Sequence, residues 1–205
     1  MKAPSLNKLI AFLLLAAALP ILAADRPAPY GTNTIYLPGF RTYVASGYAP
    51  SESNIALVRA LSAKAVGLRL LAFDTSKNNA ALLMCRMSYP VYGPGKTPFA
   101  TLLEAAANLE LAGSGLSVPE AARVQATLDE FDFSSVGGGQ WTLRATLRSP
   151  GMDPLTVQHL HTYPVSAGAV AGCTDVTNAM VPAIESFLRA LYADARFVEL
   201  VQSTP

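Results

Sequence analysis

The chain has 205 residues, of which 51% are hydrophobic and 14% charged, and its formal net charge is +1. This balance gives no strong field of either sign, which argues against a protein that binds nucleic acid or an anionic surface through charge. Once a leader sequence is set aside, about 180 residues remain, enough for one domain whose core needs neither a metal nor many disulfides.

The first residues have the three parts of a secretory signal peptide. A basic start with two lysines is followed by an apolar run over residues 9–19 and by small residues up to Ala24. The run is short for a bilayer span, so we predict a signal peptide over 1–24, cleaved after Ala23 or Ala24, with an uncleaved anchor as the alternative. No cysteine follows the run to accept a lipid. We therefore expect a periplasmic or secreted protein with no transmembrane span in its mature chain.

The first half of the mature chain mixes short strands with helices. Turn residues and hydrophobic periodicity divide this half into segments. They predict a flexible leader at 25–34, followed by a single domain over 35–205. Within this half of the domain, we expect a short strand at 35–37, an irregular stretch at 40–50 and a helix from Ser51 or Ser53 to about Lys64. A hairpin of strands at 66–73 and 81–87 should follow.

A second helix has clear start and stop signals. Thr97 caps it, Pro98 occupies its first position and Gly113 follows its end. Its apolar stripe predicts that the polar residues between these ends, Glu104, Asn108 and Glu110, lie on a solvated face.

The residue pattern from Ala121 to Leu191 predicts three strands followed by a closing helix. Alternating residues over 124–133 change phase near Asp129 or Glu130, which predicts a β-bulge there. Strands at 141–148 and 155–163 follow, and the 141–148 strand has one apolar and one polar face, as antiparallel strands do. In the closing helix, Pro182 predicts either a kink or a start near Val181. The expected fold is α+β, an antiparallel sheet of about five or six strands with two or three helices packed on one face.

Two cysteines, Cys85 and Cys173, remain in a chain that is expected to reach an oxidising compartment. We predict that they form a disulfide, which would stabilise the fold by roughly 4 kcal/mol in the chain-entropy model. The alternative is a pair of buried free thiols.

His159 and His161 are the only histidines, and their spacing puts both on one face of a strand, where they could share a metal ion. A metal site needs a third ligand, for which only Asp153, Asp175 or a free cysteine could be recruited. The pattern favours histidines at a sheet rim over a metal site. No other cofactor site is predicted.

No complete catalytic motif is present. The Gly95-Lys96-Thr97 turn is unlike a phosphate-binding loop, because Pro90 stands where a glycine is needed and flanking prolines remove backbone donors. No serine lies in a nucleophile elbow. Glu130 and Asp132 are explained as a polar strand face. We therefore predict no catalytic residues.

The segments ARVQATLDEFDFSS, GGQWTLRATLRSP, LTVQHLHTYPV and CTDVTNAMVPAIESFLRALY, within residues 121–200, resemble periplasmic auxiliary lipoproteins of ABC-type lipid transporters. The missing lipidation cysteine departs from that family. The resemblance implies a non-catalytic envelope protein that binds a partner protein or a lipid-like, apolar ligand, in a groove between sheet and helices. The alternatives are a secreted hydrolase or metal-dependent enzyme using His159 and His161, and a purely structural subunit.

Overall fold

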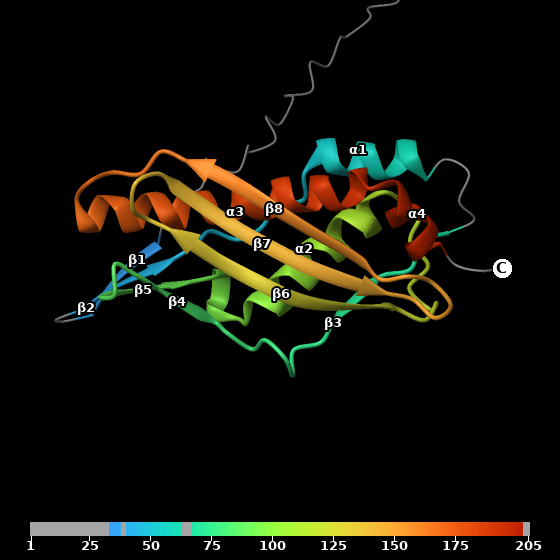
Figure 1. The fold of residues 1–205 in the computed structure, drawn as a ribbon, viewed down its shortest axis with the longest axis horizontal. Helices are drawn as coiled ribbons and strands as arrows, with labels where there is room; N and C mark the ends of the chain where they lie inside the picture. Colours follow the sequence, from blue (N-terminus) through green and yellow to red (C-terminus); the bar gives the residue numbers. More distant parts are fainter. Residues whose placement is uncertain (1–32, 38–39, 63–66, 203–205) are drawn as a thin grey trace, which may run out of the picture.

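The computed structural model describes residues 33–37, 40–62 and 67–202. The predicted signal peptide lies outside these residues, as does most of the predicted leader. The described chain forms two four-stranded sheets and four α-helices (Figure 1). The strands are β1 (Asn33–Leu37), β2 (Phe40–Val44), β3 (Leu71–Phe73), β4 (Leu82–Cys85), β5 (Tyr89–Tyr92), β6 (Val124–Ser134), β7 (Gly139–Arg148) and β8 (Leu155–Tyr163), and the helices are α1 (Glu52–Leu61), α2 (Phe99–Gly113), α3 (Ala169–Ala193) and α4 (Ala195–Val201).

The large sheet has the strand order β3-β6-β7-β8. Strands β6, β7 and β8 are antiparallel and correspond to the three strands predicted for the second half of the chain. The β6–β7 register shifts between Leu128 and Glu130, which confirms the predicted bulge. The bulge reconciles the two alternation phases of β6, since Val124, Leu128 and Phe131 are all buried.

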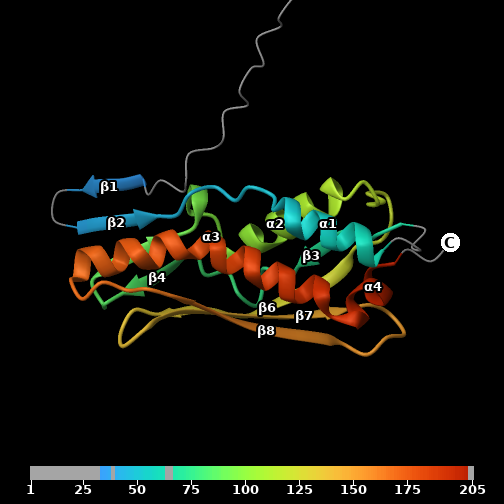
Figure 2. The same cartoon turned by 90° about the horizontal axis from the view of Figure 1, so that it is seen from above.

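Helix α3 lies between the large sheet on one side and α1 and the small sheet on the other (Figure 2). Its apolar residues meet the inner face of β7, where Trp141 is fully buried and donates a hydrogen bond from Nε1 to the Val176 carbonyl at 3.0 Å. A buried indole keeps such a partner because an unpaired N–H is costly there. The other side of α3 is covered by α1 towards its C-terminal end and by the second sheet towards its N-terminal end.

Pro182 does not divide the closing helix. Helix α3 is continuous over 25 residues with Pro182 inside it. The predicted start near Val181 is therefore wrong, whereas the alternative, a kink at Pro182 within one helix, stays a prediction. Burial of the apolar stripe on both sides of α3 outweighs the roughly 3 kcal/mol that an interior proline costs. The cost has a local consequence, because the Asn178 carbonyl loses its helical N–H donor.

The small sheet has the order β1-β2-β5-β4 and was not expected. Strand β2 was predicted as irregular, yet it pairs with β1 antiparallel and with β5 parallel. Strand β4 forms a hairpin with β5, so the predicted hairpin between 66–73 and 81–87 is wrong. Strand β3 instead runs parallel to β6. The α+β class holds, but the fold has two mixed sheets where one antiparallel sheet was predicted.

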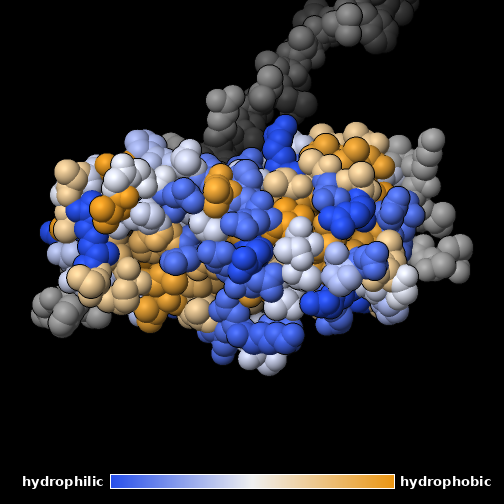
Figure 3. Space-filling model, in the orientation of Figure 1, coloured by the Kyte–Doolittle hydropathy of each residue, from blue (hydrophilic) through white to orange (hydrophobic). Residues whose placement is uncertain are grey.

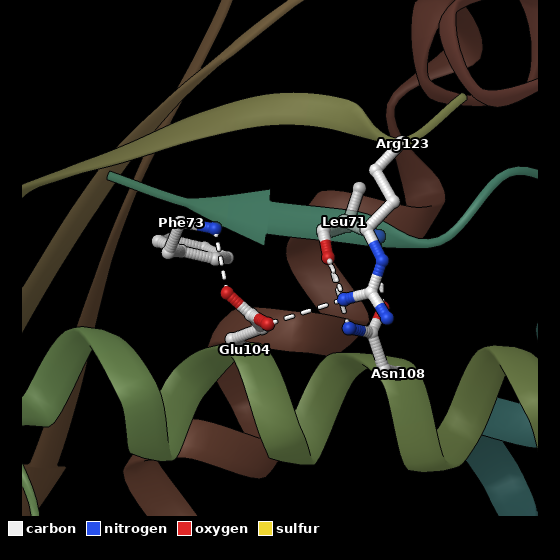
Figure 4. Close-up of polar contacts among 5 residues, drawn as sticks. All are labelled: Leu71, Phe73, Glu104, Asn108 and Arg123. Carbon is white, nitrogen blue, oxygen red and sulfur yellow. Dashed lines mark hydrogen bonds and ion pairs between the residues drawn. The ribbon is translucent and has the colours of Figure 1, made fainter. Parts of the chain in front are cut away.

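The free edge of β3 is covered by side chains of α2 (Figure 4). Asn108 accepts from the Leu71 N–H at 2.8 Å and donates to the Leu71 carbonyl at 2.9 Å, as a neighbouring strand would. Glu104 accepts from the Phe73 N–H at 2.7 Å and pairs with Arg123 at 3.3 Å. These two polar residues therefore do not lie on a solvated face, because α2 is packed on more than its apolar stripe.

Candidate functional site

The cysteines form the predicted disulfide between Cys85 and Cys173, with 5.9 Å between their Cα atoms. Cys85 ends β4 in the small sheet, and Cys173 lies in the first turns of α3, which packs on the large sheet. Both residues are fully buried. The bond therefore joins the small sheet to the helix on which it packs.

The neighbouring Arg86 gathers three loops at the same end of the molecule. It has a left-handed backbone with φ of 48° in the β4–β5 turn. Its guanidinium donates to the carbonyls of Ser135, Ser166 and Ala167, the first in the β6–β7 turn and the others in the loop before α3. These groups border a shallow cavity of about 420 Å³, which Val136 and Val165 also line.

Large apolar side chains are exposed around this end. We call the set the apolar end; it comprises side chains from the β4–β5 hairpin, the β6–β7 turn and the start of α3. Figure 3 shows hydrophobic surface in this part of the molecule, over β4 and β5. The exposed fractions are 41% for Leu82, 48% for Met84, 92% for Met87, 75% for Val136 and 38% for Val170. Such a cluster is uncommon on a surface that contacts only water.

The two histidines lie on the face of β8 that turns toward α3. His159 is opposite Leu143 and His161 opposite Trp141 in the β7–β8 ladder. Both are partly buried, and this burial lowers the pKa of each imidazole, with a further lowering at His161 from the neighbouring His159. Both rings are therefore held toward the neutral form.

The structure supplies part of a catalytic or metal-binding set around these histidines. His161 Nδ1 lies 3.2 Å from Ser186 Oγ, but the Ala183 carbonyl, 3.0 Å from the same hydroxyl, competes for its proton, so the hydroxyl is not dedicated to the ring as a nucleophile would be. Among the described residues, no group of three or more histidine, cysteine, aspartate or glutamate side chains could hold a metal ion. Cys85 and Cys173 are used in the disulfide.

A second, smaller cavity of about 240 Å³ opens between β8 and α3. His161 and Tyr163 line it from the strand, and Asp175 and Asn178 line it from the helix. Asp175 accepts a hydrogen bond from the Ser166 N–H at 2.7 Å. Burial and the nearby Asp175 charge together raise the pKa of Tyr163.

Glu110 forms a polar cluster where three helices meet. It was predicted on a solvated face, but its side chain is fully buried. It accepts hydrogen bonds from the Tyr48 hydroxyl, from the Ser51 N–H at 3.0 Å and from Asn54 at 3.2 Å. Burial raises its pKa despite these donors, and burial with the nearby Glu110 charge raises the pKa of Tyr192. This cluster binds the start of α1 to α2.

The sequence did not predict the apolar end or the Glu110 cluster. The apolar end depends on which turns meet at one end of the sheets. The Glu110 cluster depends on the burial of α2 on several sides. The hydrophobic residues Leu82, Met84 and Met87 were a partial signal for the apolar end. They do not alternate with polar residues, so the sequence alone does not show that they are exposed.

No family model matches the chain, and no curated protein matches it. Among solved structures, the crystal structure of protein XCC0632 from Xanthomonas campestris, described as belonging to the family DUF330, matches with a TM-score of 0.45 and 12% identity over 74% of this chain and 94% of that one. A likeness of this size does not assign the chain to that family.

Proposed function

We propose that this chain is a non-catalytic, exported protein of the cell envelope that binds a partner protein through its apolar end. The observation that carries the proposal is the exposure of Met84 and Met87 beside Val136 at one end of the molecule. Methionine side chains are flexible and polarisable, and surfaces rich in them adapt to protein partners. The signal-peptide pattern and the disulfide support export.

The interior favours a protein partner over an apolar ligand. Apart from the small cavity at the β8 edge, the space between the large sheet and the helices, where a ligand groove was expected, holds fully buried side chains such as Phe99, Trp141 and Phe187. Phe99 stacks on Phe131 with ring centroids 4.5 Å apart, and Phe131 packs against Trp141 at 5.2 Å. Among the described residues, no helix is long and apolar enough to cross a membrane.

Site-specific crosslinking in the native organism tests the proposal. A photoreactive residue at position 87 should capture one discrete polypeptide, because Met87 is almost fully exposed at the apolar end. Adding Met84→Ser should reduce that product several-fold, since an interface anchor typically carries over 1 kcal/mol. A photoreactive residue at Met152, an exposed methionine in the β7–β8 turn at the other end of the sheet, is the matched control.

Three results would contradict the proposal. Equal capture from positions 87 and 152 would indicate random collision. Mass spectrometry that finds a stoichiometric lipid with the purified protein, with no crosslink at position 87, would favour the ligand alternative. Stoichiometric bound metal that is lost in His159→Ala or His161→Ala would favour the metal-enzyme alternative.

A further inference from the structure

Strand β8 is a long, regular edge strand of the large sheet (Figure 1). It has nine residues, and all nine are paired with β7 on one side without a register shift. On the other side, no hydrogen bond from the described part of the chain reaches its backbone. Every second residue of β8 therefore presents a free N–H and C=O outward.

At the opposite edge of the same sheet, the outward backbone groups of β3 are already hydrogen-bonded. Asn108 and Glu104 bond to the outward backbone groups of β3, so that edge cannot accept another strand (Figure 4). Strand β8 lacks this cover and the other common protections, since residues 155–163 contain no lysine, arginine, aspartate, glutamate, proline or bulge. The sheet thus has one closed edge and one open edge.

The cavity between β8 and α3 lies along the open edge. Helix α3 lines it with the Asp175 carboxylate and with Asn178, whose side chain carries both a donor and an acceptor. Among the described residues, no lysine or arginine lines this cavity. An added strand would direct alternate side chains toward α3, and one of them would reach this cavity beside the carboxylate.

We infer that β8 binds an extended peptide segment of a partner protein as an added strand, with a lysine or arginine side chain of that segment beside Asp175. Backbone pairing provides affinity in such complexes and the side-chain cavity provides selectivity. The basic side chain pairs with the carboxylate and can donate to the side-chain oxygen of Asn178. This site is separate from the apolar end and holds whether or not the apolar end binds a partner.

A second copy of this chain fits the site less well. Two β8 strands pairing across a two-fold axis would place residues of β8 opposite the cavity. Because β8 contains no lysine or arginine, the second copy would leave the Asp175 carboxylate without a cation. The charge of the cavity therefore favours a basic peptide over self-association.

Synthetic peptides test the inference with the purified protein. The probe is a peptide as long as β8, nine residues of alternating threonine and valine with a central lysine. Its affinity is measured by fluorescence anisotropy, and its position by shifts of the backbone amide signals of 156–162. We expect it to bind about tenfold more tightly than the same peptide with a central glutamate, as a partly desolvated ion pair allows. The same lysine peptide with alternate N-methylated amides should not bind, because it has lost its backbone donors.

Variants locate the selectivity. Asp175→Asn keeps an oxygen for the Ser166 N–H, so the protein should fold and still bind the peptide, but the lysine preference should fall to less than about twofold once the charge is gone. Asp153→Asn, in the exposed β7–β8 turn, should leave the preference unchanged. A double variant Met84→Ser and Met87→Ser should bind the lysine peptide normally.

Several results would overturn the inference. Equal binding of the N-methylated peptide would show that backbone pairing is not used, and an unchanged lysine preference in Asp175→Asn would remove the cavity from recognition. A dimer through β8 that the peptide does not dissociate would identify a second copy as the occupant. Loss of crosslinking at Met87 with intact peptide binding would reject the proposed function alone.

Discussion

At the residue scale, Glu110 is a carboxyl group that is fully buried and held by several hydrogen bonds. It is fully buried, its hydrogen-bond donors are neutral, and no ion pair to it is formed among the described residues. Burial of a carboxylate without a counter-charge favours its protonated form, which is the cause of its raised pKa. A glutamine could keep acceptor contacts with Tyr48 and Ser51 without carrying a charge.

The raised pKa of Glu110 should make the free energy of unfolding depend on pH. The folded-state pKa of Glu110 lies above its unfolded value, so its contribution to stability is complete below about pH 4.3, the ordinary glutamate pKa, and is lost as pH rises through the raised pKa. The free energy of unfolding of the wild type, relative to Glu110→Gln, should therefore fall across that interval. Urea unfolding at a series of pH values measures it.

The control is Glu199→Gln, at an exposed position of α4. Its stability difference from the wild type should stay nearly constant over the same pH range. A constant difference for Glu110→Gln as well would show that the buried carboxylate has the same pKa in the folded and unfolded chains.

At the element scale, α2 completes the large sheet by acting in place of a strand. The carboxamide of Asn108 has a donor and an acceptor at nearly the spacing of a peptide unit, and it meets both backbone groups of Leu71. This arrangement fixes α2 against β3, and it protects an edge that would otherwise pair with another chain.

Replacing Asn108 should destabilise the fold. Asn108→Ala leaves the Leu71 N–H without a partner beside a fully buried side chain, and an unsatisfied group of this kind costs about 1–3 kcal/mol. Chemical denaturation of the purified protein measures the loss. Asn79→Ala, at an exposed position before β4, should cost less than about 0.5 kcal/mol. If both variants lose the same stability, the edge contacts of Asn108 contribute nothing.

At the scale of the whole molecule, the disulfide connects two layers that share few strand contacts. In the described chain no strand of the small sheet pairs with a strand of the large sheet, and the small sheet packs on α3 through β2 and β5. The bond from Cys85 to Cys173 spans a sequence separation of 88, so it restricts the unfolded chain strongly.

Removing the disulfide should lower stability by about 4 kcal/mol in the chain-entropy model, with a further loss from the cavities left by truncating two buried side chains. The measurement compares urea unfolding of the wild type, with and without reductant, to that of the double variant Cys85→Ala and Cys173→Ala. Reductant should destabilise only the wild type. Hydrogen exchange should quicken first in β4 and β5. Identical unfolding of the oxidised and reduced wild type would contradict the expected role.

The sequence alone predicted the elements whose signals are local. Alternating residues indicated β6, β7 and β8, and a change of phase in β6 indicated the bulge near Asp129. Helical periodicity indicated α1 and α2, but the predicted Thr97 cap is wrong, because α2 begins after Pro98 without a side-chain cap and Gly113 is its last residue. The disulfide was predictable because only two cysteines remain after the leader. These features depend on neighbours in the chain, so periodicity and turn chemistry carry them.

Only the tertiary structure decided which strands pair and which surfaces stay open. The parallel β2–β5 and β3–β6 ladders join segments far apart in sequence, and β3 is too short for its own pattern to specify a partner. The burial of Glu110, the closed β3 edge and the open β8 edge follow from where helices dock, which is set by the total apolar area buried. Non-local contacts of this kind do not change the periodicity of the sequence. A polar residue can lie on a solvated face or form a buried hydrogen bond, and the sequence looks the same in both cases.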